Sequence, residues 1–261
     1  IQGISETLNI DYRTPKTLKD NHVEYEFLKE LNADLAIVCA YGQIIPENFL
    51  NLTKKGFVNI HASILPSWRG AAPIQRSIMN LDPETGISIM KIKKELDSGP
   101  VSNIYKIKID QNQNAQEISE KLSALAAEKI LDNVDDILED KAKFIDQDHS
   151  KATYAKKIDK EESRIDWDED ASKIIGKING LFPSPGASFS FNGERYKILK
   201  AEIGNGIGQV GEIISNQLEV ACNKNQSIKI LEIQRQGKRP QKISEFMLGS
   251  QIKKGSKLSN V

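Results

Sequence analysis

The feature that most constrains the fold is the alternation of short apolar runs with amphipathic segments over the first half of the chain. Residues 34–40 form a continuous apolar run that ends at Tyr41-Gly42, as is typical of a fully buried parallel strand. Further strand-like runs are residues 8–12, 56–61, 86–92 and 101–109. Helical periodicity is found in residues 17–31, 70–80 and 114–138. This alternation predicts an α/β fold with a doubly wound, mainly parallel sheet that binds ligands at the carboxyl ends of its strands.

The composition changes near residue 150 of the 261. We therefore assign residues 1–150 to a first domain. Residues 151–166 are highly charged and lack a long apolar run, as expected of a linker with one helical turn. Residues 167–261 form a second domain, with a short helix near its start. Five strands are predicted in this domain, at residues 187–191, 195–201, 209–215, 218–222 and 228–233. They favour a small OB-like β-barrel, a fold that often binds nucleic acid.

Composition excludes several functional classes. No apolar run approaches the roughly 20 residues that span a bilayer, and nothing resembles a signal peptide, so we expect a cytoplasmic protein without a membrane partner. Cys39 and Cys222 lie in apolar runs and are expected to be buried free thiols. The three histidines and two cysteines match no zinc spacing, so no metal is expected.

The formal net charge is zero, but the charges are unevenly distributed. Residues 223–261 carry nine Lys or Arg against two Asp or Glu, whereas residues 131–148 carry seven acidic and two basic side chains. The basic C-terminal region is compatible with a phosphate-rich partner. A solvated, lysine-rich surface explains it equally well.

Asn59 and His61 are the strongest candidates for chemistry. They are two residues apart on a predicted strand, so both side chains point to the same face. Asp97 follows in the turn-forming segment 95–100. An amide donor, an imidazole and a carboxylate are the groups needed to transfer an activated acyl group to an amine. Taken singly, a histidine at a strand end and an aspartate in a turn are more often structural.

The segment after His61 adds binding groups. Ser63-Ile64-Leu65-Pro66 connects the strand to a helix, and its apolar pair is expected to lie against either the core or a ligand. Trp68 and Arg69 supply an indole and a guanidinium, which suit stacking and contacts with phosphate or carboxylate. Alternatively, the Trp68 side chain has a structural role and covers the start of the following helix.

Residues 59–75, with Leu96-Asp97-Ser98-Gly99 downstream, resemble the 10-formyltetrahydrofolate-dependent formyltransferases. The resemblance extends from about residue 34 to the C-terminus and is strongest in the catalytic part. It implies that Asn59, His61 and Asp97 are catalytic and that no metal is required. It also implies a 10-formyltetrahydrofolate site made by Ser63, Ile64, Leu65 and Pro66 together with Ala40, Tyr41 and Gly42.

Two segments, residues 68–76 and 153–167, are similar to the family members that act on initiator tRNA. The resemblance therefore implies formyl transfer to the α-amino group of the initiator methionyl-tRNA, for translation initiation, by a monomeric protein. The expected tRNA-contacting residues lie in the loop, the linker and the barrel and are Trp68, Arg69, Lys156, Lys157, Arg235, Lys238 and Arg239.

Two other functions stay open at this point. One is a formyltransferase acting on a sugar nucleotide, or a formyltetrahydrofolate hydrolase, with the same three catalytic residues. The other is a non-catalytic fragment that binds nucleic acid through the barrel. The family begins with a strand, a glycine-containing turn and a helix that have no counterpart in this sequence. We therefore expect an N-terminally truncated chain, in which the strand at residues 34–40 has an unpaired edge.

Overall fold

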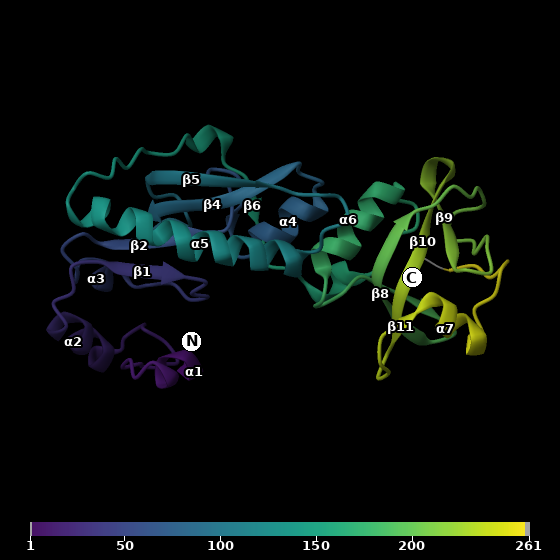
Figure 1. Cartoon of the computed structure of the whole chain (residues 1–261), viewed down its shortest axis with the longest axis horizontal. Coiled ribbons are helices and arrows are strands. Elements are labelled where there is room, and N and C mark those ends of the chain that lie inside the picture. The colour runs from purple at the N-terminus through teal and green to yellow at the C-terminus, as the bar shows by residue number, and fades with distance from the viewer. Residues whose placement is uncertain (1, 259–261) are drawn as a thin grey trace.

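The computed structural model describes residues 2–258 and shows two parts side by side, each with its own hydrophobic core (Figure 1). A four-stranded sheet organises the first part and a five-stranded sheet the second. Between them, α4 (Pro73–Met79) packs against α6 (Ala171–Leu181). The two parts are thus joined by helix packing as well as by the linker.

The first sheet has the strand order β1-β2-β4-β5. Its strands are β1 (Ala36–Cys39), β2 (Phe57–His61), β4 (Glu84–Lys91) and β5 (Val101–Lys108). Only β1 and β2 are parallel; β2–β4 and β4–β5 are antiparallel. The α/β class is confirmed, but over the described residues the sheet is mixed and not mainly parallel. The connection from β4 to β5 is too short for a parallel crossover, which needs about a dozen residues, and apolar periodicity carries no information about strand direction.

The long helix α5 (Ala115–Leu138) lies along this sheet, as predicted (Figure 1). Its first turn is closed by a capping box, in which the Asn114 side chain accepts from the Glu117 N–H and the Glu117 carboxylate accepts from the Asn114 N–H. Two N–H groups that a helix start leaves unpaired are thereby satisfied. Ile118 of α5 is fully buried and packs in one cluster with Ile87 of β4.

The predicted strand at residues 8–12 is wrong. The chain there leaves α1 (Gln2–Thr7) through Asn9, which has a positive φ of 52°, and continues without regular structure toward α2 (His22–Glu30). Leu8 and Ile10 are exposed. Alternating apolar residues form a strand only where a neighbouring strand accepts their backbone hydrogen bonds, and no strand lies beside this segment among the described residues.

The expected full burial of residues 34–40 is also wrong. Along β1, half-buried and exposed side chains alternate, and Ile37 is 47% exposed. Cys39 is exposed as well, which corrects its prediction as a buried thiol, whereas Cys222 is buried. The reason is the position of β1 at the edge of the sheet, where β2 is its single partner over residues 2–258. The short helix α3 (Glu47–Leu50) follows it.

The second sheet is antiparallel, with the order β11-β10-β8-β7 and β9 also paired to β10. Its strands are β7 (Ser188–Phe191), β8 (Glu194–Ile203), β9 (Glu219–Cys222), β10 (Gln226–Arg235) and β11 (Gln241–Lys242). Asn192 and Gly193 both have positive φ, as the tight turn between β7 and β8 requires. The predicted barrel is present as an open half-barrel, but residues 209–215 contribute isolated bridges and not a strand.

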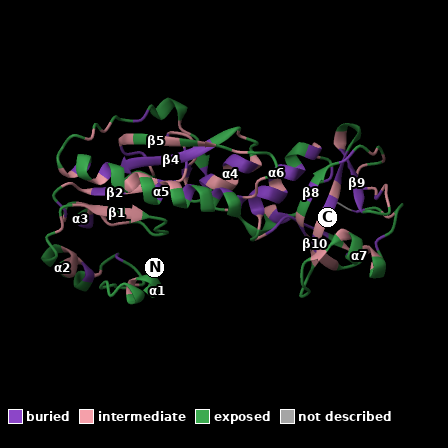
Figure 2. Cartoon of the chain, in the orientation of Figure 1, coloured by how far each residue is buried: buried purple, intermediate pink, exposed green. Residues whose placement is uncertain are grey.

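The core of the second part includes the fully buried Trp167. Much of α6 and of the strands β8, β9 and β10 is buried as well (Figure 2). The short helix α7 (Ile243–Gly249) packs against β10. A 3-10 turn, η1 (His149–Lys151), leads into the linker, and a second one, η2 (Lys160–Ser163), lies near the end of the linker. Between them, β6 (Tyr154–Ala155) pairs in parallel with β3 (Arg69–Gly70) and so ties the linker to the loop after β2.

Candidate active site

The candidate site begins at the carboxyl end of β2, where Asn59 and His61 project from one face. In register, Asn59 lies between Val38 of β1 and Met90 of β4. The Asn59 side chain is half-buried, and its amide has no hydrogen-bond partner among residues 2–258. An unengaged amide donor at a strand end is available to a substrate oxygen.

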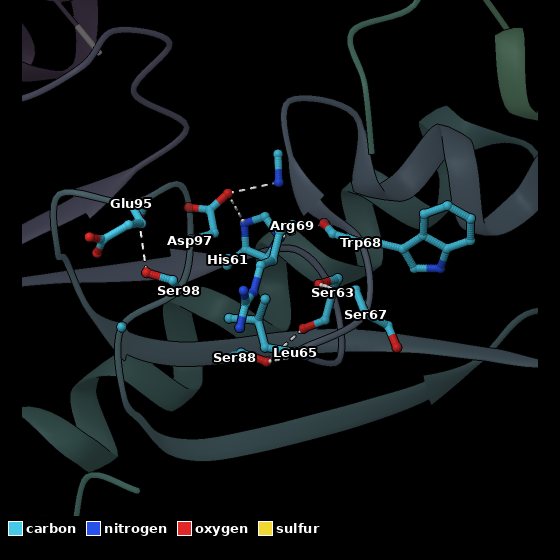
Figure 3. A network of polar contacts seen from close by, with 12 residues as sticks. His61, Ser63, Leu65, Ser67, Trp68, Arg69, Ser88, Glu95, Asp97 and Ser98 are labelled. Atoms are coloured by element: carbon cyan, nitrogen blue, oxygen red, sulfur yellow. Dashed lines mark hydrogen bonds and ion pairs between the residues drawn. The ribbon is translucent and has the colours of Figure 1, made fainter. Parts of the chain in front are cut away.

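The His61 ring is buried, and each of its nitrogens faces an oxygen atom. The Asp97 carboxylate lies beside the ring (Figure 3). Nε2 lies 2.9 Å from the carbonyl oxygen of Trp68. A carbonyl only accepts, so Nε2 carries a proton and donates it there. Nδ1 faces Oδ2 of Asp97 at 3.6 Å, which is too long for a direct hydrogen bond. Nδ1 is therefore the ring nitrogen that can exchange a proton with a group placed beside Asp97.

Asp97 is brought to His61 by the loop between β4 and β5. Its backbone has φ of 45°, in the left-handed region that few residues other than glycine adopt. Its Oδ2 accepts a hydrogen bond of 2.8 Å from the Gly70 N–H, which aims the carboxylate at the ring (Figure 3). Gly99 must be glycine, because a Cβ there would overlap the Lys91 carbonyl oxygen. The structure thus places Asp97 beside His61, and Asn59 lies two residues before His61 on the same strand face.

The segment Ser63–Pro66 is held by a residue that the sequence did not single out, Ser88 of β4. The Ser88 hydroxyl donates to the Ser63 carbonyl at 2.7 Å and accepts from the Leu65 N–H at 3.1 Å. Ser88 lies opposite His61 in the β2–β4 register, so strand pairing places it under the loop. No motif marks this serine, because its partners are backbone groups far from it in sequence.

The same segment divides into a buried and an accessible side. The Ser63 hydroxyl donates to the Ser67 carbonyl at 2.6 Å, and the Leu65 side chain is 4% exposed. Ile64 and Pro66 are half-buried. Of the expected apolar pair, Leu65 therefore lies against the core and Ile64 remains available to a ligand.

The loop at Ala40-Tyr41-Gly42 follows β1 and lies at the same edge of the sheet as the loop after β2, because these strands are parallel neighbours. Tyr41 is 40% exposed, and partial burial raises the pKa of its phenol above the ordinary value. An accessible aromatic side chain at this edge provides a flat apolar surface.

Trp68 and Arg69 differ from the expectation that both contact tRNA. Arg69 is 3% exposed, and its guanidinium binds Gln147 and approaches His149, which corrects the prediction of a phosphate contact for this residue. Trp68 is half-buried, and its indole N–H donates to Asp82 at 2.7 Å. Gln147 is a further site residue that sequence reasoning missed.

Comparison with known proteins decides the family. The model of the family described as formyl transferase matches residues 4–134, and that of the formyl transferase C-terminal domain matches residues 157–251. The chain belongs to the formyltransferase family. The resemblance seen in the sequence is thereby confirmed.

Curated relatives of this formyltransferase are similar over its full length. The methionyl-tRNA formyltransferase of Pelagibacter ubique is 65% identical over 261 residues, which are all of this chain and 84% of that protein. That of Bradyrhizobium diazoefficiens is 38% identical over 99% of this chain and 84% of that protein.

Solved structures agree on the fold. The sugar 3N-formyltransferase WlaRD, solved with dTDP and 5-N-formyl-THF, superposes with a TM-score of 0.70 at 20% identity, over 92% of this chain and 82% of that one. The N-formyltransferase of Helicobacter canadensis, in complex with folinic acid and dTDP-3-aminofucose, gives 0.69 at 18% identity, over 90% and 82%. At such identity the likeness concerns the fold alone.

The linker of this formyltransferase exposes Lys156 and Lys157 close to α4. Arg76 of α4 donates to both of their carbonyl oxygens, at 3.1 and 3.3 Å, and pairs with Glu162 through two hydrogen bonds of 2.6 and 2.9 Å. The Arg76 guanidinium also lowers the pKa of the Glu162 carboxyl. One side chain thus fixes the linker backbone that carries both lysines.

The three predicted basic residues of the C-terminal part, Arg235, Lys238 and Arg239, are exposed and line one groove of about 480 Å³. Arg235 is paired with Glu194. Lys238 and Arg239 form no ion pair with any residue in the range 2–258, so their charges are free to meet an anion.

Within residues 2–258, no group of three or more His, Cys, Asp or Glu side chains is arranged to hold a metal ion. No helix in the described range has the length and apolar content to cross a membrane.

Proposed function

We propose that this formyltransferase moves a formyl group from 10-formyltetrahydrofolate to the α-amino group of the initiator methionyl-tRNA. The observation that carries the proposal is the pairing of His61 Nδ1 with Asp97 beside the unengaged amide of Asn59. The names of the relatives at 65% and 38% identity point to the same acceptor. Both matches extend through the C-terminal part.

The reaction proceeds by attack of the neutral amine nitrogen on the formyl carbon. Asn59 donates a hydrogen bond to the oxygen as it becomes an oxyanion, which stabilises the tetrahedral intermediate. An amine nitrogen about 2.9 Å from both His61 Nδ1 and Asp97 Oδ2 fits beside this pair. Asp97 accepts the proton that the amine loses, directly or through a water. Breaking the bond between the formyl carbon and the folate nitrogen leaves that nitrogen to take up a proton, which His61 can supply from Nδ1 when the ring is protonated.

The folate co-substrate fits the edge of the sheet shared by the two predicted loops. Tyr41 and Ile64 offer accessible aromatic and apolar surface there. Ser63 and Leu65 shape this edge through their backbone, since both side chains are buried. We assign Ala40, Gly42 and Pro66 to the same binding surface.

The tRNA is proposed to lie along the exposed cations of the linker and the C-terminal groove. Lys156, Lys157, Lys238 and Arg239 are free to meet backbone phosphates, and Arg235 and the partly exposed Trp68 flank them. Each phosphate that is neutralised releases counterions, so affinity falls as salt rises, with a logarithmic slope of about 0.7–0.9 per contact. We propose further that the protein is a monomer and acts in the cytoplasm.

The test is formyl transfer from 10-formyltetrahydrofolate to methionyl-tRNA by wild type, Asn59→Ala and His61→Ala. Each substitution should lower kcat about a hundredfold or more, because a donor to the oxyanion or a proton-transfer group is lost. A dTDP-linked amino sugar is offered as a competing acceptor in parallel assays. Equal activity of wild type and Asn59→Ala, or preferred formylation of the sugar amine, would overturn the proposal.

A further inference from the structure

Asp97 adopts a left-handed backbone conformation, which is uncommon for a non-glycine residue although aspartate tolerates it better than most. It is a half-buried non-glycine residue with φ of 45°, in the loop between β4 and β5. Such a conformation persists only where surrounding contacts hold it. Contacts on the Asp97 backbone therefore contribute to the carboxylate's position, in addition to the hydrogen bond it receives from Gly70.

Gln147 provides those contacts from a segment 50 residues away. Its side-chain amide is buried, and Nε2 donates to the Asp97 carbonyl at 2.9 Å and to the Gly99 carbonyl at 2.7 Å. Both donors of the amide are thereby used on the two sides of one turn. Rotation of the Asp97 peptide would break the first bond, so Gln147 opposes relaxation of the turn.

Arg69 in turn fixes the orientation of Gln147. Its Nε and Nη2 both donate to Gln147 Oε1, at 3.0 and 2.7 Å. The Arg69 side chain is almost fully buried and pairs with no carboxylate among residues 2–258; its other neighbour is His149 Nδ1 at 3.3 Å. The buried guanidinium is hydrogen-bonded to a neutral amide and thereby fixes the orientation of that amide. A flipped amide would face Arg69 with its N–H groups, and donors would then oppose donors.

The chain therefore holds its carboxylate from two directions with consecutive residues: Gly70 donates to the side chain of Asp97, and Arg69 acts on its backbone through Gln147. Both residues belong to β3, which is paired with β6 of the linker. We propose that Gln147, oriented by Arg69, is a positioning residue that keeps Asp97 opposite His61. The catalytic consequence rests on the proposed function, whereas the structural consequence does not.

The decisive variant is Gln147→Glu. It is nearly isosteric and keeps an acceptor for Arg69, but it replaces the two amide donors with an oxygen that repels the Asp97 and Gly99 carbonyls. Gln116→Glu is the matched control, since it adds the same charge and removes an amide-donated hydrogen bond, to Glu120, on the exposed face of α5.

Two measurements are made on each protein. Steady-state kinetics should show kcat of Gln147→Glu reduced about 10- to 100-fold, with the KM of each substrate changed less than threefold, because a misplacement of about 1 Å costs up to roughly a hundredfold in rate. NMR of the substrate-free protein should show the Gly70 amide proton shifted upfield, since its partner Asp97 has moved. Gln116→Glu should change neither quantity.

A Gly70 resonance that is unchanged in a folded Gln147→Glu protein would overturn the positioning role, whatever the wild-type activity. An unchanged kcat with a shifted Gly70 resonance would overturn the catalytic consequence. Absence of formyl transfer in wild type would count against the proposed function alone, because the NMR measurement needs no substrate.

Discussion

Removal of the Ser88 hydroxyl should destabilise the loop that carries Trp68, whose carbonyl oxygen accepts a hydrogen bond from His61. Ser88 is fully buried, and its hydroxyl satisfies two backbone groups, the Ser63 carbonyl and the Leu65 N–H. In Ser88→Ala both groups stay buried without a partner. Each unsatisfied buried group costs about 1–3 kcal/mol, so we expect the free energy of unfolding of the first part to fall by about 3 kcal/mol.

Ser77→Ala is the matched control. Ser77 is also fully buried, but its hydroxyl donates only to the Ile74 carbonyl of its own helix at 3.0 Å. That carbonyl keeps its helical N–H partner, so the expected loss is about 1 kcal/mol or less.

The measurement is native-state hydrogen exchange of the amides in β2 and β4, which reports opening of the first part separately from the second. The first part must be measured separately because a chain with two cores need not unfold in one step. The reasoning is refuted if Ser88→Ala and Ser77→Ala lower the opening free energy of these amides equally. In that case the loop would satisfy its own backbone groups without the serine.

Three further outcomes are expected. Arg76→Met should raise the KM for tRNA severalfold with kcat little changed. Arg76 lowers the pKa of the Glu162 carboxyl, so the pair stabilises the folded protein above the carboxyl's unfolded pKa, and this stability is lost as pH falls through the lowered pKa. Unfolding measured as a function of pH should therefore show that Arg76→Met lacks this contribution. A thiol reagent should label Cys39 rapidly and Cys222 only on unfolding, since burial raises the pKa of the Cys222 thiol to about 12; two fast thiols would contradict this. Gly180→Ala should lower Tm and raise the KM for tRNA, because a Cβ there would lie 2.6 Å from Met79 Cγ and 2.9 Å from the Gln75 carbonyl oxygen at the α4–α6 contact; an unchanged Tm would argue against tight helix packing.

The part of the site that was predictable from sequence follows local geometry. Asn59 and His61 share a face because side chains on a strand repeat every two residues. The long helix α5 was predictable for a similar reason, since its apolar residues recur with helical periodicity along residues 114–138. Asp97 was a weaker candidate by itself, and the family motif around it brought it into the site.

The failures concern contacts that a local pattern does not contain. Residues 8–12 alternate like a strand but have no neighbouring strand, and Arg69 looks like a phosphate ligand but is buried against Gln147. A guanidinium on the surface and one in the interior have the same sequence signature. Burial depends on which distant segment packs over it, here the segment that carries Gln147 and His149.

The sequence by itself determined which chemical groups are present and which neighbours share a strand face or a helix turn, because backbone periodicity repeats over two to four residues. It also determined the family. Only the tertiary structure decided that Gly70 and Gln147 hold Asp97, that Ser88 supports the loop at Ser63, and that Arg76 fixes the linker lysines. These contacts join segments 25 to 81 residues apart in the chain, and their geometry exists only once the sheet, the loops and the two parts have packed together.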